Sequence, residues 1–233
     1  MSLSNEIINK KGYAILPINN MAKFNKLRNQ FIKRMNISDS KKNINILRRN
    51  LAKMNKSEIN KCMVNLLTFT EASNLMIESC SDIVSELSGN KIFVQRRAAT
   101  IFNLPGKDQR RQWPHYELMS GISPFTFVLW APFHDLDDDG GVFYLNQDQS
   151  NEYIKREQEQ GLVNSPLILN ELFNHQPPKL KFGEVIVFNP FILHGNISFN
   201  SNLARVACSV RFQSAKQPLM QKNTDFFKFY KFN

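Results

Sequence analysis

The sequence contains little cysteine and no long apolar run, and both shortages exclude classes of protein. Its cysteines, Cys62, Cys80 and Cys208, are odd in number and have no paired spacing, which argues against a disulfide scaffold and favours a reducing compartment. No N-terminal apolar run resembles a signal peptide, and no stretch approaches the ~20 apolar residues needed to span a bilayer. We therefore expect a soluble cytoplasmic protein without a membrane span.

Several cofactor and ion motifs are also missing. The chain has no G-x-G-x-x-G pattern, no Walker motif and no paired-cysteine zinc signature. The acidic stretch 135–139 lacks the ordered alternation and the distal glutamate of an EF-hand, so we interpret it as a solvated turn. Of the four histidines, His134 and His175 lie in acidic and proline-flanked turns, and we interpret both as surface residues.

Positive charge and phenylalanine, by contrast, are abundant. The 233 residues carry 30 Lys and Arg against 20 Asp and Glu, a net charge of +10, and they include 19 Phe. This length suits one domain with a sizeable core, and aromatic weight of this kind often fills all-β cores. The basic residues fall in separate clusters rather than in one block, so we favour an anionic small molecule over nucleic acid as the partner.

The N-terminal part of the chain combines a short strand with a long helical stretch. The segment 12–18 ("GYAILPI") predicts a strand. From residue 19 to residue 89, apolar residues recur at spacings of three and four, which is typical of helices that bury one face. The expected helices are 21–35, a second capped by Ser38 or Asp39 and ending at Met54, and a third over 57–87 with a candidate break at 68–71.

After Lys91 the pattern changes to short strands separated by turn residues. The expected strands are 91–104, 125–133, 140–145, 184–193 and 204–213, and in this half only 150–160 is expected to be helical. We predict an α+β, mainly β, single domain (1–233). A helical part (19–89) packs on a β sandwich or barrel (91–213), and the tail (214–233) covers its edge.

Two of the histidines belong to a pattern that favours iron. His115 and Glu117 are two residues apart, so their side chains would point to the same side of an extended segment. His194 ends a later apolar strand, and Arg205 follows eleven residues further on. Two histidines and one carboxylate form the ligand set of non-haem Fe(II) oxygenases, and an arginine can bind a carboxylate of 2-oxoglutarate in a bidentate manner.

The segment from about 91 to 213 resembles the phytanoyl-CoA dioxygenase-like branch of the Fe(II)/2-oxoglutarate-dependent oxygenases. The resemblance lies in "HYE", "FVLWAPFHDLDDDGGVFYLNQDQS" and "KFGEVIVFNPFILHGNISFN", followed by Arg205, and "GYAILP" resembles the opening strand of that family. It implies a double-stranded β-helix, or jelly roll, in which His115, Glu117 and His194 bind Fe(II), Arg205 binds 2-oxoglutarate, and O2 is consumed. Most members of the branch have Asp where this chain has Glu117. Halogenating members lack the carboxylate, so Glu117 argues against halogenation.

Substrate contacts are predicted from strand alternation. Arg205 and Arg211 share one face of the last strand, so both are expected to point inward. We predict that the partner of Arg211 is an anionic group of the substrate, and an internal ion pair with a protein carboxylate is the alternative. Because Arg96 and Arg97 are adjacent, one of them is expected to point inward, and we take Arg97 as the candidate. Asn196 and Trp130 are further candidates for contact with the substrate.

The sequence therefore predicts an Fe(II)- and 2-oxoglutarate-dependent hydroxylase. It would act on an unactivated C–H bond of a small polar or anionic metabolite, such as an amino acid, a sugar or a biosynthetic precursor. Two alternatives stay open. The chain could be an inactive jelly-roll binding protein, or an oxygenase that modifies protein or nucleic acid and docks it through the basic N-terminal helices.

Overall fold

The computed structural model describes Leu3, Ile7 and residues 10–37, 43–105, 114–137, 141–161, 166–196, 201–220 and 226–232. Its strands are β1 (Tyr13–Pro17), β2 (Lys91–Gln95), β3 (Ala99–Asn103), β4 (Phe127–Pro132), β5 (Val142–Tyr144), β6 (Glu184–Phe188), β7 (His194–Asn196), β8 (Arg205–Ser214) and β9 (Phe227–Lys231). Its helices are α2 (Met21–Met35), α3 (Ile44–Lys53), α4 (Lys56–Leu67), α5 (Ala72–Ser79), α6 (Ser81–Ser88), α7 (Gln147–Gln160) and α8 (Pro166–Phe173), with a short 3-10 helix η1 (Glu117–Ser120).

Helix α2 forms because its apolar residues recur on one face. Phe24, Leu27 and Phe31 are fully buried against the sheet and the neighbouring helices, as their spacing predicts. The side chain of Asn20 accepts a hydrogen bond from the backbone of Lys23 and so caps the helix N-terminus. Among the described residues, no helix is long and apolar enough to cross a membrane.

The remaining N-terminal helices differ in their limits from the prediction. Asn43 caps α3, whereas the expected caps Ser38 and Asp39 lie outside the described residues. The predicted third helix is broken at 68–71, as expected, and again at Cys80, which gives α4, α5 and α6. Shorter helices can each turn a different apolar face toward one sheet.

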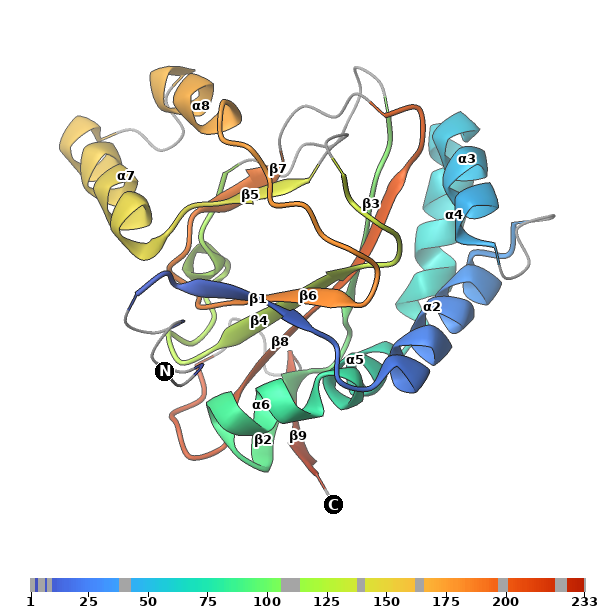
Figure 1. Ribbon diagram of the computed structural model, residues 1–233, viewed down its shortest axis with the longest axis horizontal. Helices are drawn as coiled ribbons and strands as arrows, with labels where there is room; N and C mark the ends of the chain where they lie inside the picture. The colour runs from blue at the N-terminus through green and yellow to red at the C-terminus, as the bar shows by residue number, and fades with distance from the viewer. Residues whose placement is uncertain are drawn as a thin grey trace.

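The β part has two walls, and β8 is the centre of the larger one. The large antiparallel sheet runs β1-β6-β4-β8-β2-β9, with β3 also paired to β8. Strand β8 reaches this position because it pairs with β4 on one side and with β2 and β3 in succession on the other. The facing wall is the pair β5 and β7, extended by the bridges His115–His194 and Leu136–Leu180. The result is the predicted jelly roll with α2 to α6 packed around its large sheet (Figure 1).

Alternation along β8 separates the helix-covered face from the barrel interior. One set of its side chains packs with the N-terminal helices: Val206, Cys208, Val210 and Phe212. Ala207 instead joins an inner cluster with Trp130, Tyr144 and Ile186. The neighbours of Ala207 at even spacing are Arg205, Ser209 and Arg211, so strand periodicity places these polar side chains on the inner face, as predicted.

Two further differences from the prediction concern a strand and a helix, whereas the tail agrees with the prediction. The expected strand 91–104 is divided into β2 and β3, which pair with different parts of β8. Helix α8 was not predicted, because its eight residues are too few to show a clear helical period. The tail forms β9, which pairs with β2 and therefore covers the sheet edge as predicted.

Candidate metal centre

His115 and His194 meet because their backbones pair. The backbone N–H of His115 donates to the carbonyl of His194 (2.9 Å), and the N–H of His194 donates to the carbonyl of His115 (3.1 Å). Residues directly opposite in an antiparallel bridge have side chains on the same face. The two imidazole rings consequently lie with their centroids 4.3 Å apart. Gly195 permits this pairing, since a Cβ at Gly195 would lie 3.0 Å from the backbone of Pro114.

Glu117 joins the pair through a short extended step. Tyr116 has extended dihedrals (φ −106°, ψ 145°) and packs into a separate cluster with Phe143, so His115 and Glu117 fall on the opposite side, as the two-residue spacing predicts. The extended segment is short, however, because Glu117 begins η1. One ligand atom from each of His115, Glu117 and His194 lies within 4.8 Å of the others, and no other such group of three was found in the part of the chain that the structure describes.

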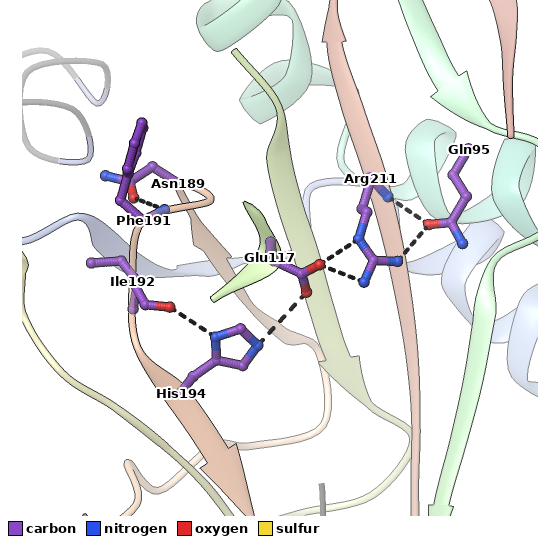
Figure 2. Close-up of polar contacts among 7 residues, drawn as sticks. All are labelled: Gln95, Glu117, Asn189, Phe191, Ile192, His194 and Arg211. Carbon is purple, nitrogen blue, oxygen red and sulfur yellow. Dashed lines mark hydrogen bonds and ion pairs between the residues drawn. The ribbon is translucent and has the colours of Figure 1, made fainter. Parts of the chain in front are cut away.

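The tautomer of His194 is set by its backbone contact. Its Nδ1 lies 2.9 Å from the carbonyl oxygen of Ile192, which can only accept a hydrogen bond, so Nδ1 carries the proton. In the neutral ring, the form that binds a metal, the lone pair is then on Nε2, which faces Glu117 Oε1 at 3.6 Å; in the protonated ring Nε2 donates toward this oxygen (Figure 2). A hydrogen bond that fixes the second ring nitrogen in this way is typical of metal-binding histidines.

Glu117 is almost completely buried and carries a compensated charge. It is 3% exposed, and its Oε2 receives Nε (2.6 Å) and Nη2 (2.5 Å) of Arg211. Burial raises the pKa of the Glu117 carboxyl, but the contact with His194 and the charge of Arg211 outweigh burial and lower it to about 2. The structure therefore shows the alternative partner of Arg211, a protein carboxylate, in place of the predicted substrate anion, and this carboxylate is a candidate metal ligand.

Arg205 occupies the inner face of β8 at the other end of the strand. It is 2% exposed, its Nη2 donates to Asn196 Oδ1 (2.5 Å), and its guanidinium carbon lies 5.8 Å from the ring of Trp130. Burial lowers the pKa of Arg205 to about 10, which the neighbouring Tyr144 partly opposes. Arg205 Nε, Asn196 Nδ2 and the Tyr144 hydroxyl are buried and have no hydrogen-bond partner within the described ranges.

Comparison with solved structures shows the same fold. EctD from S. alaskensis in its apo form superposes with a TM-score of 0.57 at 12% identity, over 94% of this chain and 79% of that one. The ThoJ–Ni complex, a non-haem monooxygenase, gives 0.56 at 12% identity over 96% and 85%. SnoK, a non-haem α-ketoglutarate-dependent carbocyclase from nogalamycin biosynthesis, gives 0.55 at 12% identity over 99% and 97%. No family model and no curated protein sequence matches the chain.

The chain therefore shares the jelly-roll fold of these oxygenases. At 12% identity the likeness extends to architecture alone, so the roles of individual residues depend on the geometry of this chain.

Some predicted site residues lie elsewhere. Arg96 and Arg97 are both exposed in the bend between β2 and β3, so the expectation that one of them points inward is wrong.

His134 is not a surface residue. It is 5% exposed, its Nδ1 lies 2.7 Å from the Asp135 carbonyl oxygen, and its Nε2 accepts from the backbone N–H of Val206 (3.1 Å), which ties the end of β4 to β8. His175 is partly buried, beside the ring of Phe143.

Two residues of the site were missed as candidates. Gln95 accepts hydrogen bonds from Arg211, and Tyr144 stacks on His194 with ring centroids 5.7 Å apart. The signal for Tyr144 lies in the register of β5 on β7, where it stands opposite His194. That register cannot be read from either strand alone, because both are only three residues long.

Proposed function

We propose that the chain is an Fe(II)- and 2-oxoglutarate-dependent oxygenase. The observation that carries this proposal is the convergence of His115, Glu117 and His194 within 4.8 Å inside a jelly roll. Two imidazoles and a carboxylate hold Fe(II) through one face of the ion and leave the remaining positions open for other ligands. The hydrogen bond from Nδ1 of His194 leaves Nε2 as the ligand atom, and the low pKa of Glu117 keeps its carboxyl group ionised.

Arg205 supports 2-oxoglutarate as the cosubstrate. A buried guanidinium without an anion is costly, yet within the described ranges no carboxylate is paired with Arg205. Its Nε, the Tyr144 hydroxyl and Asn196 Nδ2 are donors that still lack an acceptor in that part of the chain. The far carboxylate of 2-oxoglutarate supplies both the missing negative charge and the missing acceptor oxygens.

The residues of the chain bind, orient and exclude water. When bound, Fe(II) and 2-oxoglutarate supply the oxidising chemistry, in which O2 is consumed and 2-oxoglutarate becomes succinate and CO2. Arg205 and Tyr144 would fix the far carboxylate, and His115, Glu117 and His194 would hold the ion. Phe188 and Tyr144 pack on the His194 ring, at centroid distances of 4.8 and 5.7 Å, and keep water from that side of the imidazole.

We further propose hydroxylation of an unactivated C–H bond in a small polar or anionic metabolite, and membership of the phytanoyl-CoA dioxygenase-like branch. The net charge of +10 supports an anionic substrate. EctD, which has been solved with 2-oxoglutarate and 5-hydroxyectoine, shares the fold at a TM-score of 0.51 and supports a small molecule. The free, buried state of Cys62, Cys80 and Cys208 supports a reducing, cytoplasmic location.

The test is reconstitution of the purified chain with Fe(II) and 2-oxoglutarate without oxygen, followed by exposure to air. We expect a visible charge-transfer band that needs both components, and succinate formation after O2 is admitted. His194→Ala is the matched control and should show neither. A wild-type chain that gives no band and no succinate would contradict the proposal.

The same assay separates the two alternatives. An inactive binding protein would give the band but no succinate with any compound of a metabolite library. An oxygenase that modifies nucleic acid would bind its substrate through the basic surface, and that binding would fall steeply with salt concentration. Turnover of a small metabolite that is insensitive to salt supports the proposed substrate class.

A further inference from the structure

The two oxygens of Glu117 face different partners. Oε2 receives both Nε and Nη2 of Arg211, at 2.6 and 2.5 Å, while Oε1 faces Nε2 of His194 at 3.6 Å (Figure 2). Charge-assisted contacts of this length are among the stronger hydrogen bonds of a protein, so Oε2 is already committed. Only Oε1 is directed toward the candidate metal ligands.

Arg211 is itself held in place from behind by Gln95. Gln95 Oε1 accepts from both the backbone N–H and Nη1 of Arg211, each at 3.2 Å. Gln95 Nε2 donates to the carbonyl of Arg97 at 2.7 Å. The sequence of contacts therefore runs from the backbone of Arg97 through Gln95 and Arg211 to Glu117.

A local interruption of strand pairing makes this arrangement possible. Ile92 to Val94 pair with Phe212 to Ser214, but β3 resumes with Ala99 opposite Ser209, which leaves two extra residues in the bend at 96–98. At the bulge, the side chain of Gln95 takes the backbone N–H of Arg211 in place of a ladder carbonyl. Bulges beside active sites commonly redirect a side chain in this manner.

The contacts by which Gln95 and Arg211 hold Oε2 of Glu117, here called the clamp, matter because a metal ion has a limited number of coordination positions. An octahedral ion has six positions, of which the two histidines and one carboxylate oxygen would take three. A chelating 2-oxoglutarate would take two more and leave one for O2. If Glu117 bound through both oxygens, that last position would be lost.

We propose that Arg211, fixed by Gln95, is a positioning residue that withholds Oε2 of Glu117 from the metal and so keeps one position open. This inference rests on the proposed function and adds to it a role for Arg211 and Gln95. It also explains a use for Glu rather than Asp at position 117. The longer side chain spans from η1 to the guanidinium on β8 while Oε1 still faces His194.

The test compares the wild-type chain with Arg211→Gln and Gln95→Glu. In Arg211→Gln the clamp is absent, and in Gln95→Glu a second carboxylate competes for the guanidinium. We expect both variants to bind one Co(II) per chain, with a changed d–d absorption spectrum that reports altered coordination. Succinate formation without prime substrate should fall roughly 10- to 100-fold, the usual effect of removing a residue that orients a metal ligand. Arg211→Lys, which keeps the charge but offers one donor group, should restore part of both signals.

Thr126→Val is the matched control for general damage to this region. Thr126 Oγ1 bonds to the side chain of Gln213, two residues beyond Arg211 on β8, and Thr126 contacts no candidate ligand. This variant should leave the Co(II) spectrum unchanged. If Arg211→Gln does not fold, Gln95→Glu carries the test, since it retains the arginine.

The outcomes distinguish this inference from the proposed function. A wild-type chain with no Co(II) band, or with a band that His194→Ala retains, overturns the proposed function. A wild-type band that is unchanged in Arg211→Gln and Gln95→Glu, or that disappears altogether in both, overturns the positioning role and leaves the function standing. An unchanged rate of substrate-free succinate formation in both variants overturns it as well, because it would place Arg211 on the prime substrate instead.

Discussion

Arg205 makes opposite contributions to stability and to binding. A buried guanidinium that, within the described part of the chain, donates to the amide oxygen of Asn196 and to no carboxylate lowers the stability of the unliganded chain, since it was removed from water without an anion. The same unpaired charge makes the residue a strong receptor for a carboxylate. The environment of Arg205 therefore suits a residue that binds an anionic ligand, and it does not suit a residue whose only role is structural.

We predict that Arg205→Met separates these contributions. Loss of the charge pair should weaken 2-oxoglutarate binding by about 2–5 kcal/mol, which corresponds to roughly 30-fold to several thousand-fold. Without 2-oxoglutarate, the variant should melt at the same temperature as the wild type or higher. Added 2-oxoglutarate should raise the melting temperature of the wild type only. A variant that is destabilised and still responds to 2-oxoglutarate would assign Arg205 to the scaffold.

Tyr144 and Tyr116 allow a matched test of one hydroxyl group. Both hydroxyls are buried without a partner among the described residues, but Tyr144 stacks on His194 while Tyr116 packs with Phe143 in a separate cluster. Burial raises the pKa of Tyr144, so its hydroxyl stays protonated and can donate.

We predict that Tyr144→Phe weakens 2-oxoglutarate binding roughly 10- to 100-fold, the value of a hydrogen bond to a charged group. Tyr116→Phe should change it little. The measurement is a titration of 2-oxoglutarate against the charge-transfer band of the Fe(II) form. Equal effects of the two substitutions would show that the Tyr144 hydroxyl does not reach the cosubstrate.

At the scale of elements, the metal centre depends on how closely the segment before η1 approaches β7. Gly195 is the residue that sets this distance, because a Cβ there would lie 3.0 Å from Pro114 and 3.1 Å from the ring of Phe143. We predict that Gly195→Ala displaces the 114–115 backbone by a few tenths of an ångström and lowers Co(II) affinity roughly tenfold, within the range for indirect ligand effects.

Gly161→Ala is the control for this prediction. Gly161 ends α7 with a positive φ of 61°, and nothing lies within 4 Å of its Cβ position. Its substitution should cost about 1 kcal/mol of stability through backbone strain without affecting metal affinity. Equal losses of metal affinity in the two variants would mean that general destabilisation, rather than the approach to Pro114, is responsible.

Elements with a clear period could be predicted from the sequence. The helical face of α2 and the alternation of β8 follow from side chains that repeat every three to four or every two residues, and the inward direction of Arg205 and Arg211 followed from the latter. The bulge after Gln95 could not be predicted, because it is a difference between the register of β2 on β8 and the register of β3 on β8. The exposed position of Arg97 is a consequence of that bulge.

The candidate site likewise contains residues that the sequence identifies and contacts that only the structure shows. His115, Glu117 and His194 were identified by residue type and order, and the structure brings them together. The contact between Arg211 and Glu117 joins segments 94 residues apart, so no local pattern shows it. His134 appears in an acidic turn of the sequence, and only the return of β8 beside it explains its burial.

At the scale of the whole molecule, the helices and the jelly roll share one core. The largest buried cluster contains side chains from α2 to α6 together with the outer faces of β2, β4, β6 and β8. Helix α3 is also joined to the start of β8, since Arg48 Nε donates to the carbonyl of Ala204 (2.9 Å) and the N–H of Ala204 donates to the carbonyl of Arg48 (3.2 Å). A sheet whose outer face depends on the helices should not survive their loss, which is why we propose a single domain over 1–233.

We predict that the two parts unfold in one transition. In a Trp113→Phe variant, the remaining tryptophan is Trp130, which is buried in the inner cluster of the barrel and reports on the jelly roll. Far-ultraviolet circular dichroism reports mainly on the helices. The urea curves from the two probes should coincide, and Arg48→Met should move both to lower urea by the same amount, since removing a buried donor leaves the Ala204 carbonyl unpaired at a cost of about 1–3 kcal/mol. A circular dichroism transition that precedes the fluorescence transition would show that the helices unfold independently, and the chain would then comprise two domains.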